Sequence, residues 1–318
     1  METKTMLFSV IIPAYNEEKS LPECLRSLQQ QTLNNDEFEV IVIDNGSTDK
    51  TQEIAKSFAA TVLINTEKNV SGLRNLGANK AKGKVLAFID ADCTAFDDWL
   101  ESAKMYIEDE AVSAWGSPPS VPDEATWVQK SWYHLRKKNA QIVAVNWLES
   151  MNLFVRKDTF FSVGGFNESL ITCEDVDFSY RIAQQGKILS DSRIRVIHYG
   201  EADTIEHFIK KEFWRGISNY SGVFSHRFKW SELSSLLFPI YFAFFLPSVL
   251  IWAAMSHYPL IKVLALLALL APFLGVTFKL LKKKLGVFEL LQLQLLIHIY
   301  FIVRTLSAFK GLFNQFKK

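Results

Sequence analysis

Two aspartates one residue apart, Asp90 and Asp92, follow the apolar run at residues 85–89. Side chains two residues apart on an extended backbone point to the same side, so both carboxylates can face one divalent cation or one diphosphate. An isolated Asp-x-Asp is also common in solvated acidic turns. Here two further apolar runs end in polar or acidic residues, and a Glu174–Asp175 pair follows later in the chain. Together these residues predict a binding site for a divalent metal and a diphosphate.

Short apolar runs alternate with helix-length amphipathic segments in the first third of the chain. This alternation is typical of largely parallel strands joined by helical crossovers. The expected strands cover residues 7–12, 39–44, 61–64, 85–89 and 111–115. In such a doubly wound α/β sheet, ligands collect outside the carboxyl ends of the strands. We therefore expect one pocket to gather the polar residues at 13–17, 44–47 and 90–92.

The composition limits the class of protein. Lysine and arginine (35) almost balance aspartate and glutamate (34), so no general basic field favours nucleic acid as a partner. Three widely spaced cysteines fit neither a disulfide framework nor a zinc site, and we interpret them as reduced thiols facing the cytosol. The first residues have no apolar segment of the signal-peptide type, so membrane insertion would use later segments.

The middle of the chain, residues 117–215, is expected to complete the same globule. Pro118, Pro119 and Pro122 mark a break, and a helix is expected over residues 126–138. A second helix is expected over residues 174–185. Its periodicity predicts a stripe of Val176, Tyr180 and Ala183, with Asp177 and Arg181 paired on another face.

Two long apolar stretches near the end of the chain predict a transmembrane hairpin. Residues 233–256 carry no charge, and residues 260–281 are nearly as apolar, so each is long enough to cross a hydrocarbon core of about 30 Å. Cations flank both outer ends, at 226–229 and 279–284, which places those flanks and the globular domain on the cytoplasmic side. Residues 288–303 contain several polar residues, and we favour an interfacial amphipathic helix over a third span.

The polar strand ends occur in an order that resembles a known family. The segments at residues 10–18 (VIIPAYNEE), 40–49 (VIVIDNGSTD), 72–77 (GLRNLG) and 88–92 (FIDAD) resemble the nucleotide-sugar half of family 2 glycosyltransferases with the GT-A fold. Residues 164–168 (GGFNE) and 174–181 (EDVDFSYR) are similar to the acceptor-side motifs of that family. The resemblance covers residues 6–200. It implies a GT-A mixed sheet, with C-terminal membrane helices after it.

This resemblance gives a predicted division of the chain. Residues 1–116 would be the nucleotide-sugar half of the GT-A domain, and residues 117–225 its acceptor half. Residues 226–285 would be the transmembrane hairpin, and residues 286–318 the interfacial helix with a basic tail.

The resemblance also implies a metal cofactor, Mg²⁺ or Mn²⁺, which neutralises the diphosphate as its leaving oxygen gains charge. Asp92 is expected to be the direct ligand, and Asp90 is expected to hold ribose or a metal-bound water. His198 stands where many relatives supply a further ligand or a phosphate contact. A packed or surface histidine is an equally open interpretation of His198.

The donor-binding residues are expected at the strand ends. Glu17 and Asp44 offer hydrogen-bond acceptors for base and ribose, and Arg74 is expected to contact the diphosphate. The other expected members of the nucleotide-sugar site are Pro13, Tyr15, Asp90 and Ala91. Asn45 replaces the second acid of the common Asp-Asp-Gly-Ser pattern, which leaves the nucleotide open. Residues 47–49 are expected to cap the next helix instead.

Inversion at the anomeric carbon requires a base that takes the proton of the acceptor hydroxyl. Asp175 matches the base of the family, and Glu174 is a candidate ligand of the acceptor hydroxyl. We expect the amino-terminal end of a helix to keep Asp175 ionised. Asp177 and Arg181 are interpreted as a helix-surface or interdomain pair.

The sequence thus predicts a multi-pass protein of the inner (plasma) membrane with a cytoplasmic, inverting glycosyltransferase domain. It would move sugar from a nucleoside diphosphate sugar to a hydroxyl acceptor, with a lipid-linked acceptor as one option, in cell-surface polysaccharide, glycolipid or polyprenyl-linked glycan synthesis. Two alternatives stay open. One is transfer to a polyprenyl phosphate, which needs no base, and the other is a non-catalytic membrane protein that binds nucleotide sugar.

Overall fold

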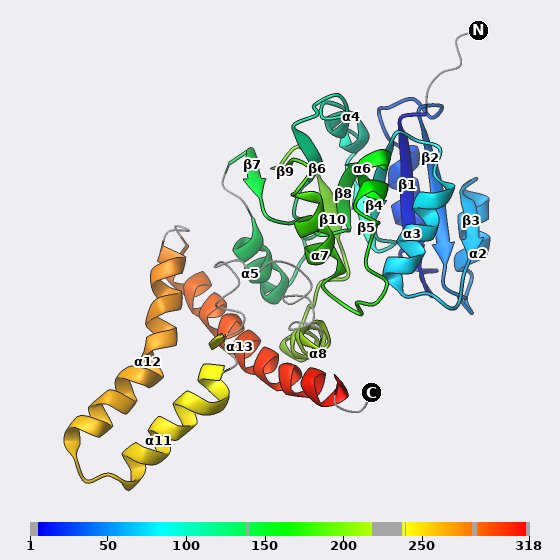
Figure 1. Ribbon diagram of the computed structural model, residues 1–318. Helices are drawn as coiled ribbons and strands as arrows, with labels where there is room; N and C mark the ends of the chain where they lie inside the picture. The colour runs from blue at the N-terminus through cyan, green and yellow to red at the C-terminus, as the bar shows by residue number, and fades with distance from the viewer. Residues whose placement is uncertain (1–5, 138–139, 218–236, 239, 282–284, 316–318) are drawn as a thin grey trace. The chain divides into compact units, whose positions relative to one another are not determined.

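The apolar runs of the sequence become the strands of a mixed sheet. The computed structural model describes residues 6–137, 140–217, 237–238, 240–281 and 285–315. These form two compact units, Met1–Asp123 with Arg136–Glu201, and Glu124–Leu135 with Ala202–Lys318. Within the described residues of the first unit, eight strands pair in the order β3-β2-β1-β4-β8-β6-β9-β7, and a separate ribbon pairs β5 with β10 (Figure 1). The predicted α/β class is confirmed.

The strand bounds agree with the predicted ones to within two residues wherever a strand was expected in the first third of the chain. The strands of the large sheet are β1 (Phe8–Ala14), β2 (Phe38–Asp44), β3 (Thr61–Ile64), β4 (Val85–Ile89), β6 (Val112–Gly116), β7 (Ile142–Val145), β8 (Asn152–Arg156) and β9 (Lys187–Asp191). The ribbon consists of β5 (Cys93–Ala95) and β10 (Val196–His198). β1 to β4 are parallel, whereas β8 runs antiparallel to both β4 and β6.

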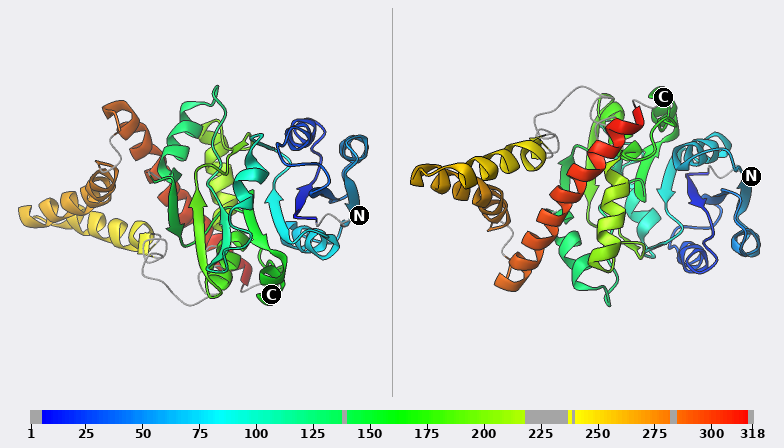
Figure 2. Two further views of the ribbon diagram at one scale, coloured as in Figure 1. Left: turned by 90° about the horizontal axis from the view of Figure 1, so that it is seen from above. Right: turned by 90° about the horizontal axis from the view of Figure 1, so that it is seen from below.

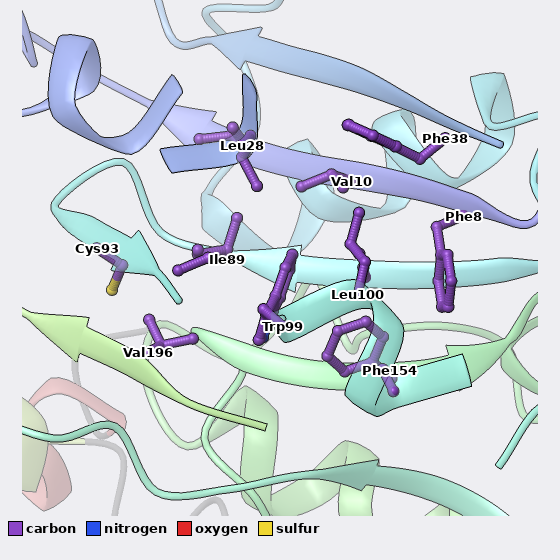
Figure 3. Close-up of a cluster of buried hydrophobic side chains, with 14 of the residues drawn as sticks. Phe8, Val10, Leu28, Phe38, Ile89, Cys93, Trp99, Leu100, Phe154 and Val196 are labelled. Carbon is purple, nitrogen blue, oxygen red and sulfur yellow. The ribbon is translucent and has the colours of Figure 1, made fainter. Parts of the chain in front are cut away.

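Alternation along the central strands supplies two separate hydrophobic cores. Val10 and Ile12 of β1 belong to one buried cluster, and Ile11 between them belongs to the other, because successive side chains leave opposite faces of a sheet. Figure 3 shows the first cluster, in which Trp99 and Phe154 pack beside the central strands. Both faces of the sheet are therefore covered, as a buried parallel sheet requires.

Helices cover the two faces. The helices of the first unit are α1 (Leu21–Gln29), α2 (Thr51–Ser57), α3 (Val70–Lys80), α4 (Trp99–Lys104), α6 (Lys157–Ser162) and α7 (Glu174–Ile182). α1 and α4 contribute Leu25 and Leu100 to the first cluster, whereas α3 and α7 contribute Leu73 and Phe178 to the second. The Asn69 side chain accepts a hydrogen bond from Gly72 N–H and so fixes the start of α3.

The core face of α7 includes more than the predicted stripe. Tyr180 of that stripe is buried, and Ala183 packs against the second cluster. Phe178 and Ile182, which the predicted stripe does not include, are fully buried in the same cluster.

The second unit consists of helices. It contains residues 124–135 of the segment around α5 (Trp127–Arg136), together with α8 (Ile205–Gly216), the short π-helix η2 (Tyr241–Phe245), α11 (Leu246–Met255), α12 (Pro259–Leu281) and α13 (Val287–Gln315). α8 and α13 run side by side (Figure 2), and Phe208 packs against Leu296 between them. The buried Glu212 of α8 forms an ion pair with Arg304 of α13 at 3.0 Å. α13 is thus packed along one face.

Among the described residues, two helices are long and apolar enough to cross a membrane, by length and composition only. They cover Pro259–Phe278 and Val287–Lys310. The first matches the second predicted span. In the first predicted span, the structure has the apolar helix Tyr241–Met255, which is shorter than predicted. Residues 226–236, before this helix, lie outside the described residues. The predicted flanking cations at 282–284 also lie outside them. The interfacial placement predicted for residues 288–303 stays a prediction.

Candidate active site

The fold places Asp92 opposite His198. Asp92 directly follows β4 and Asp90–Ala91, and the antiparallel register of the ribbon pairs Cys93 of β5 with His198 of β10. As a result, His198 Nε2 lies 3.2 Å from Asp92 Oδ2. The side chain of His198 is buried, whereas that of Asp92 is 29% exposed. The pair therefore combines a fixed imidazole with a carboxylate that solvent or a ligand can reach.

Gly200 makes this approach of Asp92 and His198 possible. A Cβ atom at position 200 would lie 1.9 Å from Asp92 Oδ2 and 2.9 Å from His198 Nε2. Since real side chains do not tolerate such contacts, the missing side chain leaves a cradle around the carboxylate oxygen. Any larger residue at this position would displace the Asp92 carboxylate.

Burial and two neighbouring carboxylates shift the pKa of His198 in opposite directions. Burial lowers the pKa of His198, but the carboxylates of Asp92 and Glu201 more than offset this and raise it to about 9. The Glu201 Oε1 lies 3.6 Å from His198 Nδ1. The imidazole therefore lies between two acidic groups, one at each ring nitrogen.

Asp92, Cys93 and His198 offer ligand atoms within 4.8 Å of one another. The predicted set was Asp92, Asp90 and His198. This group contains two of the three, and the role predicted for Asp90, holding ribose or a metal-bound water, stays a prediction. Burial raises the pKa of the Cys93 thiol well above its usual range. Sulfur is also a soft ligand, whereas Mg²⁺ and Mn²⁺ prefer harder oxygen and nitrogen donors. Asp92 and His198 are thus the members of the group that suit Mg²⁺ or Mn²⁺.

Arg74 joins the two acidic centres of the site. Its Nη2 atom lies 2.8 Å from Asp90 Oδ1, and its Nη1 atom lies 2.9 Å from Glu174 Oε1. The side chain is only 4% exposed, and its guanidinium also lies over the ring of Phe166. Asp90 and Glu174, 84 residues apart in the chain, therefore lie on either side of one cation.

These contacts add a second role for Arg74. Its predicted contact with the diphosphate stays a prediction, and in the structure each of its two terminal nitrogens contacts a carboxylate. Its observed contacts are those of a bridge that holds Asp90 and Glu174 together.

Asp175 occupies the first turn of α7. This helix begins directly after Cys173, which has a backbone φ of 65°, an uncommon value for a residue other than glycine. Burial, together with the nearby charges of Glu174 and Glu149, raises the pKa of Asp175 from its ordinary 3.8 to about 8, although Arg74 and the Val176 N–H oppose this. The expectation that the helix terminus keeps Asp175 ionised is therefore wrong, because burial outweighs the helix dipole.

The other predicted donor residues lie at the carboxyl ends of β1 and β2. Pro13 and Ala14 end β1, in register with Ile43 and Asp44 of β2. Tyr15 is 57% exposed, whereas Ala91, beyond β4, is buried. The sheet thus brings the predicted segments to one edge, as expected from the topology.

Asp44 is buried and holds its own turn. Its Oδ2 atom accepts hydrogen bonds from the N–H groups of Gly46 and Ser47 and from Gln52. Its Oδ1 atom is buried and has no hydrogen-bond partner among the described residues. Half-buried Glu17 accepts a hydrogen bond from the Ser20 hydroxyl, and burial raises the pKa of Glu17 above its ordinary value.

The loops after β1 and β2 are linked to each other. Ser47 Oγ accepts from Asn16 N–H, Asn16 Oδ1 accepts from Thr48 N–H, and Asp49 Oδ2 accepts from Glu18 N–H. Residues 47–49 were expected to cap the next helix. Only Asp49 does so, through Oδ1 and the Thr51 N–H. Ser47 accepts from Asn16 N–H, and Thr48 donates to Asn16 Oδ1, so both bond to the facing loop instead.

Asp177 and Arg181 form a structural link. Arg181 Nη2 lies 2.6 Å from Asp177 Oδ2, and Arg181 also donates to the carbonyl groups of Val163 and Gly165. Since Asp177 is buried, the prediction of a surface or interdomain pair is wrong. The pair instead fixes the Gly164–Gly165 turn against α7.

Three charged residues near the site were missed by the sequence reasoning. Glu201 and Glu149 are buried, and both lie close to Arg136, at 2.8 and 3.8 Å between the charged atoms. They come from different loops and a helix end, with no motif between them. Only the position of Glu201, three residues after His198, could have drawn attention to it.

Comparisons with known proteins agree with this geometry. The sequence model of Glycosyl transferase family 2 matches residues 9–165. Glycosyltransferase AglE of Haloferax volcanii is 34% identical over 222 residues, which cover 66% of this chain and 72% of AglE. The chain belongs to glycosyltransferase family 2. It is therefore an enzyme of the glycosyltransferase class.

Solved structures with low sequence identity confirm the GT-A fold of this glycosyltransferase. A structure of the mannosyltransferase PcManGT from Pyrobaculum calidifontis, in complex with GDP-Man and Mn²⁺, has a TM-score of 0.70 at 19% identity and covers 98% of this chain and 88% of that one. A structure of S. aureus TarS residues 1–349 in complex with UDP has a TM-score of 0.51 at 23% identity and covers 67% and 65% of the two chains.

The side chains of this possible metal group fit Mg²⁺ or Mn²⁺ chemically. Asp92 supplies a carboxylate that is 29% exposed, His198 supplies a nitrogen, and the missing side chain of Gly200 lets both lie close to the backbone there. A carboxylate with an imidazole suits Mn²⁺, and a carboxylate with water suits Mg²⁺. These two residues are therefore those that would hold such an ion.

Proposed function

We propose that this family 2 enzyme is an inverting, metal-dependent transferase that moves a sugar from a nucleoside diphosphate sugar to a hydroxyl acceptor. The observation that carries the proposal is the Arg74 bridge between Asp90 and Glu174. It brings the donor-side acidic loop and the Glu174–Asp175 pair into one site, as a reaction with a leaving diphosphate and an attacking alcohol requires.

Asp175 has the properties of a general base for the acceptor hydroxyl. Its pKa of about 8 makes its ionised form a stronger base than an ordinary aspartate. In the proposed step, Asp175 takes the hydroxyl proton while the acceptor oxygen forms a bond to the anomeric carbon. The bond from that carbon to the diphosphate oxygen breaks, and its electron pair leaves with the diphosphate.

The donor would be held by the edge of the sheet. A bound Mg²⁺ or Mn²⁺ would supply positive charge to the diphosphate. Asp44 Oδ1 is the buried acceptor available for a ribose or base donor, and Tyr15 is an exposed ring on the neighbouring loop. The bound ligands of PcManGT and TarS, GDP-Man and UDP, support a nucleotide of this class.

The apolar helices support a membrane location for the acceptor. α12 and α13 have the length and composition of membrane helices, and α13 also packs on the amphipathic α8. We propose that they attach the enzyme to the inner (plasma) membrane with the catalytic domain on the cytoplasmic side. Lipid-linked glycans and surface polysaccharides under synthesis are acceptors found at that surface.

The test is donor consumption by the purified chain with UDP-GlcNAc, UDP-glucose and GDP-mannose, each with Mn²⁺ and with a chelator. We expect slow, metal-dependent release of nucleoside diphosphate from one donor, and faster release with a hydroxyl acceptor. The anomeric configuration of the product, measured by NMR, should be inverted. No consumption of any donor by a folded chain that binds one would favour the non-catalytic alternative.

The Asp175→Asn variant separates the two enzymatic alternatives. A hydroxyl acceptor needs the base, whereas a polyprenyl phosphate is already anionic. Transfer to polyprenyl phosphate by this variant at the wild-type rate would favour a polyprenyl-phosphate transferase and would contradict the proposal.

A further inference from the structure

Behind the Asp92–His198 pair lies a cluster of buried charges that the proposed chemistry does not use. It consists of Glu201, Arg136 and Glu149, all in the first unit. The side chains of Glu201 and Glu149 are 3% and 10% exposed. Charges are rarely buried in this way without partners, because removal from water costs several kcal/mol for each ion. The contacts of the cluster show what it positions.

Each contact of the cluster leads to the next. His198 Nε2 faces Asp92 Oδ2, while His198 Nδ1 faces Glu201 Oε1 at 3.6 Å. The same Glu201 oxygen lies 2.8 Å from Arg136 Nη2, and Arg136 Nη1 lies 3.8 Å from Glu149 Oε1. The 3.6 Å separation is longer than a hydrogen bond but short enough for strong attraction at a buried site.

A histidine that binds a metal through one nitrogen usually directs the other toward a carboxylate. That second contact fixes the ring orientation and strengthens the ligand. Glu201 stands at this place relative to His198, and Arg136 balances the charge of Glu201. We infer that Glu201 and Arg136 are positioning residues, which hold His198 with its Nε2 atom directed toward the metal site at Asp92. This inference rests on the proposed metal-dependent function.

The arrangement explains why Arg136 contacts two glutamates. With Glu201 alone, the guanidinium could follow a rotation of the glutamate side chain. The second contact, to Glu149 beyond β7, anchors Arg136 from another loop and so restricts Glu201. Through these contacts, Arg136 restricts Glu201, and Glu201 in turn restricts His198.

The experiment measures Mn²⁺ binding by the whole chain without donor, from the electron paramagnetic resonance signal of free Mn²⁺. We expect Glu201→Ala to weaken Mn²⁺ binding by about 10- to 100-fold, the range typical for loss of such a supporting carboxylate. Glu201→Gln keeps an oxygen opposite Nδ1 and should recover part of the loss. Arg136→Met should weaken binding less than Glu201→Ala.

Two control variants match the charge removals. Glu101→Ala removes an exposed glutamate of α4, and Arg26→Ala removes an exposed arginine that pairs with Glu23 of the same helix. Both should bind Mn²⁺ as the wild type does. The thermal midpoint of each metal-free variant reports folding, and Glu201→Gln serves as the test if Glu201→Ala does not fold.

The outcomes distinguish this inference from the proposed function. A folded Glu201→Ala or Glu201→Gln that binds Mn²⁺ as tightly as a wild type active in sugar transfer would overturn the inference alone. Weaker Mn²⁺ binding by these variants, in a chain that consumes no nucleotide sugar, would support the inference while the proposed function fails. A purely structural ion pair would lower the thermal midpoint and leave the Mn²⁺ affinity unchanged, which also contradicts the inference.

Discussion

The two acidic centres of this enzyme have opposite surroundings. Asp90 and Asp92 lie beside cationic or protonatable partners, Arg74 and His198, and both carboxylates are partly exposed. Asp175 is half-buried beside two further acids, Glu174 and Glu149, and its pKa is raised to about 8. The first environment favours fixed negative charge and the second favours a bound proton. The proposed function uses this difference, with a cation at the first centre and proton transfer at the second.

The largest expected effect comes from removing the proton acceptor, Asp175. Asp175→Asn should lower turnover by about 10²- to 10⁴-fold, the usual contribution of a general base, because an amide cannot accept the hydroxyl proton. Steady-state sugar transfer measures this loss. Mn²⁺ binding should stay unchanged, since the variant leaves Asp92 and His198 intact. Wild-type turnover by the folded variant would remove Asp175 from the mechanism.

The next largest effect is expected from removing Arg74, which bridges Asp90 and Glu174. Arg74→Met should reduce the free energy of unfolding by about 3 kcal/mol, because it leaves Asp90 and Glu174 without their buried counter-charge. Urea denaturation monitored by circular dichroism measures the change. Arg26→Met, on the surface of α1, is the matched control and should change stability by no more than about 0.5 kcal/mol.

A third variant acts on the cation-binding centre. Gly200→Ala should weaken Mn²⁺ binding by about 10-fold or more, because the new Cβ atom occupies the position of Asp92 Oδ2. Gly275→Ala is the control, since a Cβ atom there meets nothing within 4 Å. Equal Mn²⁺ affinity for the Gly200 variant and the wild type would show that Asp92 does not bind the ion from its observed position.

A further prediction tests the raised pKa of Asp175 through the pH dependence of stability and activity. The folded protein keeps the Asp175 proton up to about pH 8, whereas the unfolded chain releases it near 3.8. The folded state therefore binds more protons in this window, so stability should fall as pH rises from about 4 to 8 and then level off. In the same protein, kcat/KM should rise toward pH 8 as the base ionises.

The charged groups that face Asp175 are Glu174, Glu149 and Arg74. Glu149→Gln removes one like charge, so the rise of kcat/KM should move to lower pH. Thermal unfolding and kcat/KM measured across the range test both statements. A stability that does not change between pH 4 and 8 would contradict the raised pKa of Asp175.

Local sequence patterns predicted the donor half of the fold well. The central strands were found because each is an apolar run of at least four residues bounded by turns, and the topology then placed Asp44 and Asp92 at one edge. β7 and β9 were not predicted. The segment at 142–145 is an apolar run of only four residues outside the regular alternation of strands and helices, and the segment at 187–191 mixes polar and apolar residues without a clear period.

The details of the site depended on contacts that no sequence pattern contains. Arg74 lies 100 residues before Glu174, and Arg136 lies 65 residues before Glu201, so neither pairing has a local signal. The pKa of Asp175 was misjudged for a related reason. Its helix position is visible in the sequence, but the burial that dominates its pKa comes from the whole fold.

The ribbon of β5 and β10 has a consequence for the newly made chain. Asp92 is synthesised early, but His198 and Glu201 follow more than a hundred residues later. Until that later stretch has left the ribosome and paired with β5, the acidic loop lacks its imidazole partner. An incomplete chain therefore contains the strands of the donor half without the Asp92–His198 pair, and under the proposed function such fragments would not cleave nucleotide sugars.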